Sequence, residues 1–319
     1  MHLLVPFASD TSEACRHVLN DLALPNLERL LTRLSPAGRD EGAARSFSPP
    51  HERALAAAWG WRGGDGKLPF AAHAAAGDGV ATGDAAWAML TPSHWQIGRD
   101  DVVLIDPDRL DLDEAESRAL FASAEALLTS EGFATAWGGA GRWYAARDDL
   151  HSLATASLDR VIGRGVDYWL RESADAGDDG TRAVARLLRR LQSEAQLVFY
   201  DHGVNAAREE RGALAVNSFW LSGCGRAQAA EPAATPEIAD ILRAPLFAND
   251  WAAWAEAWHD LDRGPVARLL GHARTGEATT LTLCGERTAA RFELRPRTLW
   301  QRLRGVGAKT AAHALLAAL

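Results

Sequence analysis

The chain has 319 residues, of which 47% are hydrophobic and 24% are charged, and its formal net charge at pH 7 is −8. This length and composition allow a sizeable core, which excludes the class of disordered proteins. The acidic balance argues against a nucleic-acid partner, because proteins that neutralise phosphates carry a basic surface.

The sequence also argues against secretion and membrane insertion. The first residues, MHLLVPFASD, have no basic region, and their apolar run is shorter than that of a signal peptide. No stretch approaches the roughly 20 apolar residues of a membrane span. The three cysteines, Cys15, Cys224 and Cys284, are widely spaced and form no CxxC motif, which is typical of reduced thiols. We therefore expect a cytoplasmic protein without a membrane partner; the sequence leaves its oligomeric state open.

The N-terminal part predicts strands and helices in alternation. Residues 2–7 predict a strand, and a helix follows the polar turn at residues 8–12. Pro25 suits the first turn of a second helix, which carries a leucine face. Residues 35–50 are rich in serine, proline, glycine and charge, so we expect an exposed connection there. A short alanine-rich helix is expected at residues 51–61.

The next part predicts a smaller α+β subdomain at about residues 62–172, inserted into a single α/β domain spanning residues 1–319. Apolar stretches at 87–98 and 102–105 predict strands, and a capping pattern with Glu116 predicts a helix to about residue 131. Residues 133–147 have the pattern of a hairpin.

The most periodic helix is expected at residues 181–201, buried against a sheet. Its predicted apolar face consists of Val184, Leu187, Leu188, Leu191, Ala195 and Val198. Toward the end of the chain we expect a short helix at 236–242, a helix at 250–262, strands at 279–284 and 289–294, and a helix at 296–303. The stripe of Trp251, Trp254 and Trp258 favours a core or inter-domain contact over an aromatic ligand site.

A candidate ligand site lies in the stretch from residue 215 to residue 225. Residues 215–221 predict a buried strand that ends in a loop at Ser222–Gly225. Ligands of α/β sheets bind beyond the carboxyl ends of strands, where glycines let backbone N–H groups approach an anion. Asn217, Ser222, Gly223 and Gly225 are therefore predicted to bind a ligand.

Further polar residues precede that strand. His202, Asn205 and Arg208 or Glu209 recur at helical spacing, so they share one face if residues 202–211 continue as a helix. Such a face could bind a phosphorylated ligand through Arg208 or Arg211. The alternative is an ordinary polar helix end. His94 lies in an otherwise apolar strand region, where it is either a core histidine or part of the same site. The carboxylates from Asp106 to Asp113 lack the spacing of an EF-hand, which favours a solvated turn.

Two segments of the sequence resemble a known family. Residues 201–212, with His202 and Asn205, and residues 216–225, with Asn217 and a Gly-x-Gly end, resemble the archaeal-type cofactor-independent phosphoglycerate mutases. Residues 24–30, LPNLERL, are similar to a helix of the same superfamily. The whole chain is similar to the RpfE-type regulatory protein family.

This resemblance implies an alkaline-phosphatase-like α/β fold, with a mostly parallel central sheet and helices on both faces. Active members of the superfamily hold two divalent metals and use a serine or threonine nucleophile. The Asp-Gly pair expected after the first strand is replaced here by Phe7-Ala8, and no late Asp-His pair follows a C-terminal strand. We therefore predict no metal site and no cofactor, and leave any catalytic residue unassigned.

The hypothesis that follows is a phosphoglycerate-mutase-like protein that binds a ligand or acts as a regulator. Its partner would be a small phosphorylated metabolite or a protein. One alternative is an active phosphomutase or phosphatase that uses manganese or magnesium, held by residues such as Asp10, Asp106 and His94. A second alternative is a protein-interaction scaffold.

Overall fold

The structure is a computed structural model that describes residues 1–99, 101–175, 177–230, 235–294 and 312–319. Its contacts divide the chain into two compact units. Unit 1 comprises Met1–Arg45, Pro49–Trp61 and Ala230–Leu319, and unit 2 comprises Ser46–Ser48 and Arg62–Ala229. The insertion predicted at about 62–172 lies within unit 2, which continues to Ala229. The prediction that both units belong to one α/β domain stays a prediction.

Unit 1 contains a five-stranded sheet in the order β2-β11-β10-β1-β9. Its strands are β1 (His2–Val5), β2 (Ser35–Glu41), β9 (Glu237–Ile238), β10 (Thr280–Cys284) and β11 (Thr288–Glu293). Strand β1 runs parallel to β9 and β10, whereas β11 is antiparallel to both β10 and β2.

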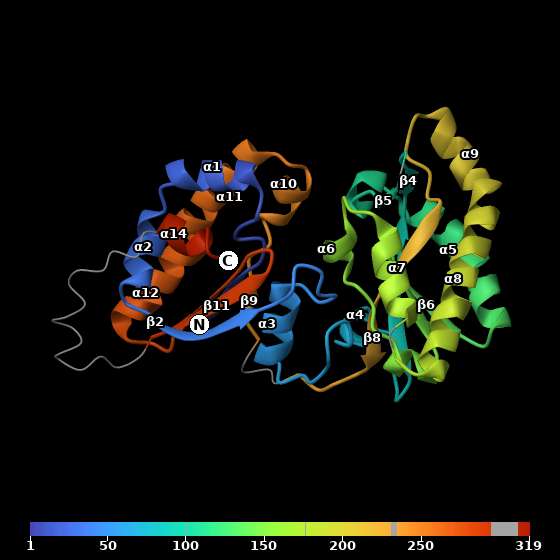
Figure 1. The fold of residues 1–319 in the computed structure, drawn as a ribbon, viewed down its shortest axis with the longest axis horizontal. Coiled ribbons are helices and arrows are strands. Elements are labelled where there is room, and N and C mark those ends of the chain that lie inside the picture. Colours follow the sequence, from blue (N-terminus) through green and yellow to red (C-terminus); the bar gives the residue numbers. More distant parts are fainter. Residues whose placement is uncertain (100, 176, 231–234, 295–311) are drawn as a thin grey trace. The chain divides into compact units, whose positions relative to one another are not determined.

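Helices cover both faces of this sheet (Figure 1). They are α1 (Glu13–Asp21), α2 (Pro25–Leu31), α3 (Pro50–Ala58), α10 (Arg243–Phe247), α11 (Trp251–Leu261), α12 (Ala267–Thr275) and α14 (Ala312–Leu316). Leu3 and Val5 point into the larger helical layer, while Leu4 between them packs near α3 on the other face. Trp254 and Trp258 are fully buried in the larger layer, which confirms the core prediction for the tryptophan stripe.

The LPNLERL segment has a structural role in this layer. Helix α2 begins at Pro25 and has no side-chain cap of its own. The buried carboxylate of Asp262 accepts hydrogen bonds from the N–H groups of Asn26, at 3.1 Å, and Leu27, at 2.7 Å. A negative charge at a helix N-terminus satisfies free N–H groups and favours the helix dipole. The segment therefore anchors α2 to the turn after α11.

Unit 2 contains a four-stranded antiparallel sheet in the order β6-β7-β3-β8 and a two-stranded ribbon, β4-β5. The strands are β3 (Ala86–Ser93), β4 (Trp95–Ile97), β5 (Val102–Leu104), β6 (Ala134–Gly139), β7 (Arg142–Ala146) and β8 (Ser218–Arg226). The helices are α4 (Phe70–Gly77), α5 (Glu114–Ser130), α6 (Leu158–Val161), α7 (Val166–Asp175), α8 (Asp179–Tyr200) and α9 (Gly203–Glu210).

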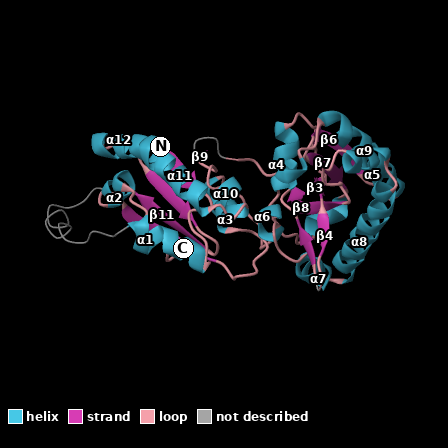
Figure 2. Ribbon diagram, turned by 90° about the horizontal axis from the view of Figure 1, so that it is seen from above, coloured by secondary structure: helices cyan, strands magenta, loops and turns pink. Residues whose placement is uncertain are grey.

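The four-stranded sheet has helices on both faces, as Figure 2 shows. Ala88 and Leu90 of β3 pack in the core that contains α5 and α8, whereas Trp87 packs against α4 on the other face. This alternation along one strand is what a sheet covered on both sides requires. Helix α8 buries Leu188, Leu191 and Ala195 as predicted, but Val198 is 38% exposed because Phe199 takes the core position.

The fold is thus mixed α/β, and the prediction of a mostly parallel sheet is wrong. Strands β6 and β7, like β10 and β11, are joined by short turns, and such hairpins are necessarily antiparallel. In the part of the chain that the structure describes, no helix has the length and apolarity to cross a membrane.

Two local predictions in unit 1 are also wrong. Residues 35–41 form β2 rather than an exposed connection, because an edge strand with one pairing partner tolerates polar, mostly exposed side chains. In the region predicted as a helix at 236–242, the chain forms the short strand β9. The helix predicted at 296–303 lies outside the described residues.

Asp78, the residue after the end of α4, links this helix to the sheet of unit 2 through hydrogen bonds. Arg142 on β7 donates to both carboxylate oxygens of Asp78, at 2.9 and 2.8 Å, and the Tyr144 hydroxyl donates to one of them at 2.6 Å. A Cβ atom on Gly138 would lie 2.3 Å from the same carboxylate, so glycine is required there. The hydrogen bonds from Arg142 hold the pKa of Asp78 below its usual value.

We therefore expect Asp78 to stabilise the fold in a pH-dependent way. Because its pKa is lowered in the folded state, its contribution is complete above the unfolded pKa of about 4 and is lost as the pH falls through the lower folded pKa. Asp78→Asn should lower the free energy of unfolding by about 1 kcal/mol at neutral pH. Urea unfolding from about pH 6 to about pH 3 should show the difference from wild type shrinking.

The matched control is Asp179→Asn, which removes a carboxylate whose side chain is 99% exposed and which pairs with Arg182 on the same helix. It should change the free energy of unfolding by less at every pH. A difference between wild type and Asp78→Asn that stays constant with pH would contradict the assignment.

Candidate functional site

Several of the predicted site residues surround one irregular segment, Leu214–Asn217, which leads into β8. Its backbone groups are bonded by side chains: Arg208 Nε donates to Leu214 O at 2.7 Å, and His94 Nδ1 lies 2.8 Å from Ala215 O. A carbonyl oxygen can only accept, so Nδ1 of His94 carries the proton. A partly buried backbone without regular sheet pairing is stabilised by such bonds. His94 and Arg208 therefore hold the entry to the strand.

Asn205 is committed to the same segment. Its side chain accepts from Val216 N–H at 2.9 Å and donates to Val216 O and Phe199 O, both at 2.7 Å. Asn205 is only 6% exposed, and these bonds use its carbonyl and its amino group. It joins the end of α8 to the start of β8 and has little left to offer a ligand.

Arg208 is fully buried, although sequence reasoning placed it on a ligand-binding face. Its guanidinium forms an ion pair with Glu116 on α5 and donates to Leu110 O. Arg211 pairs with the other oxygen of Glu116, but its side chain is 49% exposed. The buried charge of Arg208 is thus compensated inside the protein, which makes it a structural residue.

Asn217 and His202 also bond to nearby backbone. Asn217 Oδ1 accepts from Trp95 N–H at 2.7 Å, and its Nδ2 donates to Trp95 O at 2.9 Å. His202 precedes α9, where its Nδ1 accepts from Val204 N–H at 3.2 Å. His202, Asn205 and Arg208 therefore conform to the alternative of a polar helix end.

Ser222, Gly223 and Gly225 lie inside β8 and not in a loop after it, so that local prediction is wrong. The strand continues to Arg226 through an irregularity opposite Ala88, where Gly223 has φ +67°. A Cβ atom on Gly223 would lie 2.8 Å from Ala71 N, and one on Gly225 would lie 3.0 Å from Pro69 Cβ. The glycines thus let α4 approach the sheet, which explains them without a ligand.

The predicted site residues therefore form no single site. Along an extended strand, Ser222 and the glycines lie roughly 15 Å or more from Asn217. Cys224, between the glycines, is fully buried, and burial raises the pKa of its thiol to about 12. All three cysteines are free and buried, as expected for reduced thiols.

The structure instead shows two adjoining cavities beside α8. The larger, which we call the α8 groove, has a volume of about 430 Å³. The α8 groove is lined by Trp95, Ile97, Val102, Val166, Asp167, Leu170, Arg189, Gln192, Ser193, Gln196, Tyr200 and Asn217. Among the predicted site residues, Asn217 is the one that lines it.

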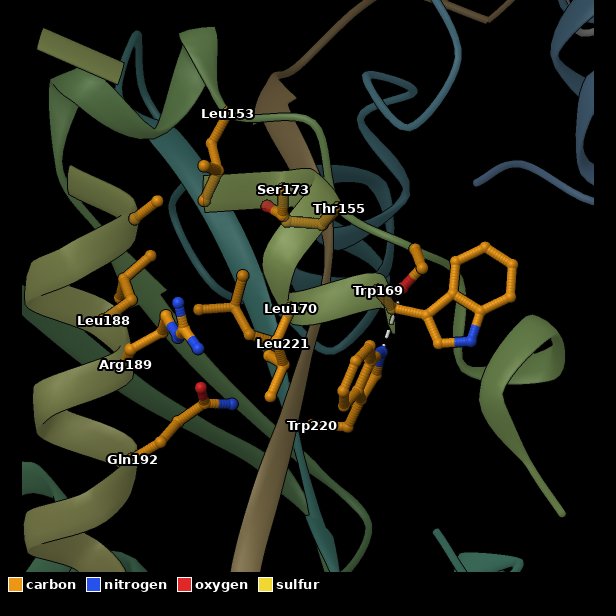
Figure 3. A pocket seen from close by; sticks show the side chains of 12 residues that line it. Leu153, Thr155, Trp169, Leu170, Ser173, Leu188, Arg189, Gln192, Trp220 and Leu221 are labelled. Atoms are coloured by element: carbon orange, nitrogen blue, oxygen red, sulfur yellow. Dashed lines mark hydrogen bonds between the residues drawn. The ribbon is translucent and has the colours of Figure 1, made fainter. Parts of the chain in front are cut away.

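The smaller, which we call the inner cavity, has a volume of about 40 Å³ and lies between α7, α8 and β8 (Figure 3). The inner cavity is lined by Leu153, Thr155, Ala156, Trp169, Leu170, Ser173, Ala185, Leu188, Arg189, Gln192, Trp220 and Leu221. Leu170, Arg189 and Gln192 line both cavities, so these residues mark where the two meet.

Arg189 and Gln192 are the polar groups at this junction. Both project from α8 toward Leu170 and Leu221 in Figure 3. No described residue forms a hydrogen bond or ion pair with the Arg189 guanidinium, whereas its neighbour Arg190 pairs with Glu131 at 2.6 Å. Gln192 is 5% exposed, and its side chain makes one hydrogen bond within the described chain, from Nε2 to Phe219 O at 3.1 Å. The junction therefore offers a free cation and a buried amide.

The residues suggested as metal ligands make hydrogen bonds within the protein. Asp10 Oδ1 accepts from Ser12 N–H at 2.7 Å in unit 1, while the Asp106 side chain caps a short helix in unit 2. Among the described residues, no group of His, Cys, Asp and Glu side chains is placed to hold a metal ion. The described residues therefore do not bring together the Asp and His side chains that a two-metal phosphoryl-transfer site needs.

Comparison with protein-family models finds no match, and comparison with curated proteins finds none either. Among solved structures, the chain is similar to a cofactor-independent phosphoglycerate mutase from Thermoplasma acidophilum DSM 1728, at 12% identity and a TM-score of 0.38, over 92% of this chain and 89% of that one. It is also similar to the PH0037 protein from Pyrococcus horikoshii, at 12% identity and a TM-score of 0.45, over 92% and 87% of the two chains. At this distance the chemistry of those proteins does not transfer, and membership in the RpfE-type family stays a prediction.

The structural assignment of Arg208 predicts a large loss of stability when it is replaced. Arg208→Met leaves a buried carboxylate without its buried partner, so the free energy of unfolding should fall by about 3–5 kcal/mol. Arg211→Met removes the exposed partner of the same Glu116 and should cost about 1 kcal/mol or less. Urea unfolding of the two variants measures the difference. Equal effects would contradict the structural role of Arg208.

Proposed function

We propose that this is a ligand-binding protein and that it binds a small organic anion beside α8, where the α8 groove meets the inner cavity. The observation that carries the proposal is the Arg189 guanidinium, which has no partner in the described chain and lines both cavities. A guanidinium binds carboxylates and phosphates through paired N–H groups. The buried amide of Gln192 lies one turn further along the same face of α8 and adds a second donor.

The rest of the α8 groove suits the organic part of such a ligand. One wall is apolar, with Trp95, Val102 and Val166, and the exposed side chains of Ile97 and Tyr200 stand at its edge. A concave site with an apolar wall and few polar groups is the usual form of a small-molecule site. The groove also contains the carboxylate of Asp167, which would repel the anionic end of a ligand and so favour its placement at Arg189.

This proposal corresponds to the ligand-binding hypothesis from the sequence and requires no metal. The metal-dependent alternative would draw on Asp10, Asp106 and His94, but His94 Nδ1 lies 2.8 Å from Ala215 O and the Asp106 side chain caps a short helix. The scaffold alternative relied on an exposed tryptophan stripe, and Trp254 and Trp258 are fully buried. If the protein has the regulatory role that the family resemblance implies, binding of the anion beside α8 would be the signal that it responds to.

The proposal is tested with 8-anilinonaphthalene-1-sulfonate, an anion with an apolar ring system whose fluorescence rises in apolar surroundings. We expect the folded protein to bind one molecule, with its sulfonate on Arg189 and its rings in the α8 groove. Arg189→Gln should weaken binding about 10-fold or more, because a hydrogen bond to a charged group is lost. Fluorescence titration measures the dissociation constants.

The control is Arg186→Gln, which removes a neighbouring arginine of α8 that lines neither cavity. It should leave the dissociation constant within about twofold of wild type, the small change expected for a surface charge. Equal binding by wild type and Arg189→Gln would overturn the proposed site.

A further inference from the structure

We infer that the anion is a short-chain carboxylate, with its head group on Arg189 and Gln192 and its alkyl chain in the inner cavity. This inference rests on the proposed function and adds the chemical class of the ligand. It follows from the walls, the size and the mouth of the inner cavity, which we consider in turn.

The walls of the inner cavity are apolar where a ligand would touch them. Leu153, Ala156, Leu188 and Leu221 supply aliphatic surface around it. The Trp220 indole N–H beside this surface is already bonded, because it donates to Ala156 O at 2.9 Å, a bond drawn in Figure 3. An aliphatic wall favours an alkyl chain over a hydroxylated chain.

Two further hydroxyls near the cavity differ in their contacts. The Ser173 hydroxyl donates to Ala154 O at 2.6 Å, whereas the buried Thr155 hydroxyl has no hydrogen-bond partner among the described residues. A ligand chain that placed a hydroxyl or an ammonium group beside Ser173 would have to break an existing contact.

The size of the inner cavity suits a short chain. Its volume of about 40 Å³ compares with the 10–15 Å³ that one water-sized group requires. The cavity therefore holds roughly three or four methylene-sized groups. A carboxylate of about five carbons fills it when the head group stays outside, at the mouth.

The mouth favours a single negative charge. Arg189 is the one arginine that lines both cavities, and Asp167 contributes a carboxylate to the wall of the α8 groove. A phosphate dianion would face one cation and one anion, whereas a monoanion is matched by the single guanidinium. Gln192 adds the amide N–H that is not used in its bond to Phe219 O. A planar carboxylate can accept from both residues.

The inference is tested with the unmodified protein by displacing 8-anilinonaphthalene-1-sulfonate with sodium salts of unbranched carboxylates, from acetate to decanoate. Affinity should rise about fourfold for each added methylene as far as pentanoate, and then level off when the inner cavity is full. Inorganic phosphate should displace the probe more weakly than pentanoate.

Two variants separate the inner cavity from the groove. Ala185 lines the inner cavity alone, so Ala185→Leu should fill it and abolish the rise of affinity with chain length. Ser193 lines the α8 groove alone, so Ser193→Leu should leave that rise unchanged up to pentanoate. Circular dichroism checks that each variant is folded. The displacement series with carboxylates of increasing length is measured on the unmodified protein and tests the inference even if a variant does not fold.

An affinity that keeps rising through decanoate would place the chain in the α8 groove and overturn the inference. Stronger displacement by phosphate than by pentanoate would overturn it as well. Both outcomes leave the proposed function standing, since the probe itself would still depend on Arg189. Loss of that dependence would contradict the proposed function instead, so the two failures are distinguishable.

Discussion

The arrangement of unit 2 depends on how the partly buried backbone between Arg211 and Ser218 is hydrogen-bonded. This segment joins α9 to β8 without regular pairing, so Arg208 and Asn205 bond its peptide groups. Arg208 can be buried there because Glu116 on α5 compensates its charge. Helix α5, helix α9 and strand β8 are thereby held together, which fixes the wall on which α8 packs.

The same constraint explains why Asn205 and Arg208 bond to the backbone; that the polar residues singled out in the sequence bind a ligand stays a prediction. Histidine, asparagine and arginine near a strand end are typical both of binding sites and of side chains that satisfy irregular backbone, and sequence spacing cannot separate the two. Asn205 and Arg208 belong to the second kind. The glycine pair is similar: Gly223 and Gly225 could serve an anion, but here they let α4 approach. The sequence prediction missed Gln192. The signal that could have found it is a glutamine next to Leu191 on the otherwise apolar face of the helix.

Much of the local structure was predictable because it depends on near neighbours. Hydrophobic periodicity located α8, and the capping pattern with Glu116 located α5, whose N-cap Asp113 accepts from Glu116 N–H at 2.8 Å. Strand β2 was missed because its polar residues carry no period-two signal and it is held by pairing with the distant β11. Sheet direction was mispredicted for a related reason: the resemblance implied parallel strands, whereas in the sheet of unit 2 a short turn makes β6 and β7 antiparallel and β3 pairs antiparallel with the distant β7 and β8.

The central claim is that the junction of Arg189 and Gln192 binds an anion whose chain enters the inner cavity. It is tested most directly by a crystal structure of the protein soaked with 4-bromobutanoate, which matches pentanoate in length because bromine has the size of a methyl group; the bromine is located by its anomalous scattering. The account predicts a bromine peak between Leu188 and Leu221, with carboxylate oxygens at about 2.7–2.9 Å from Arg189. A bromine peak in the α8 groove, or no peak in either cavity, would contradict it.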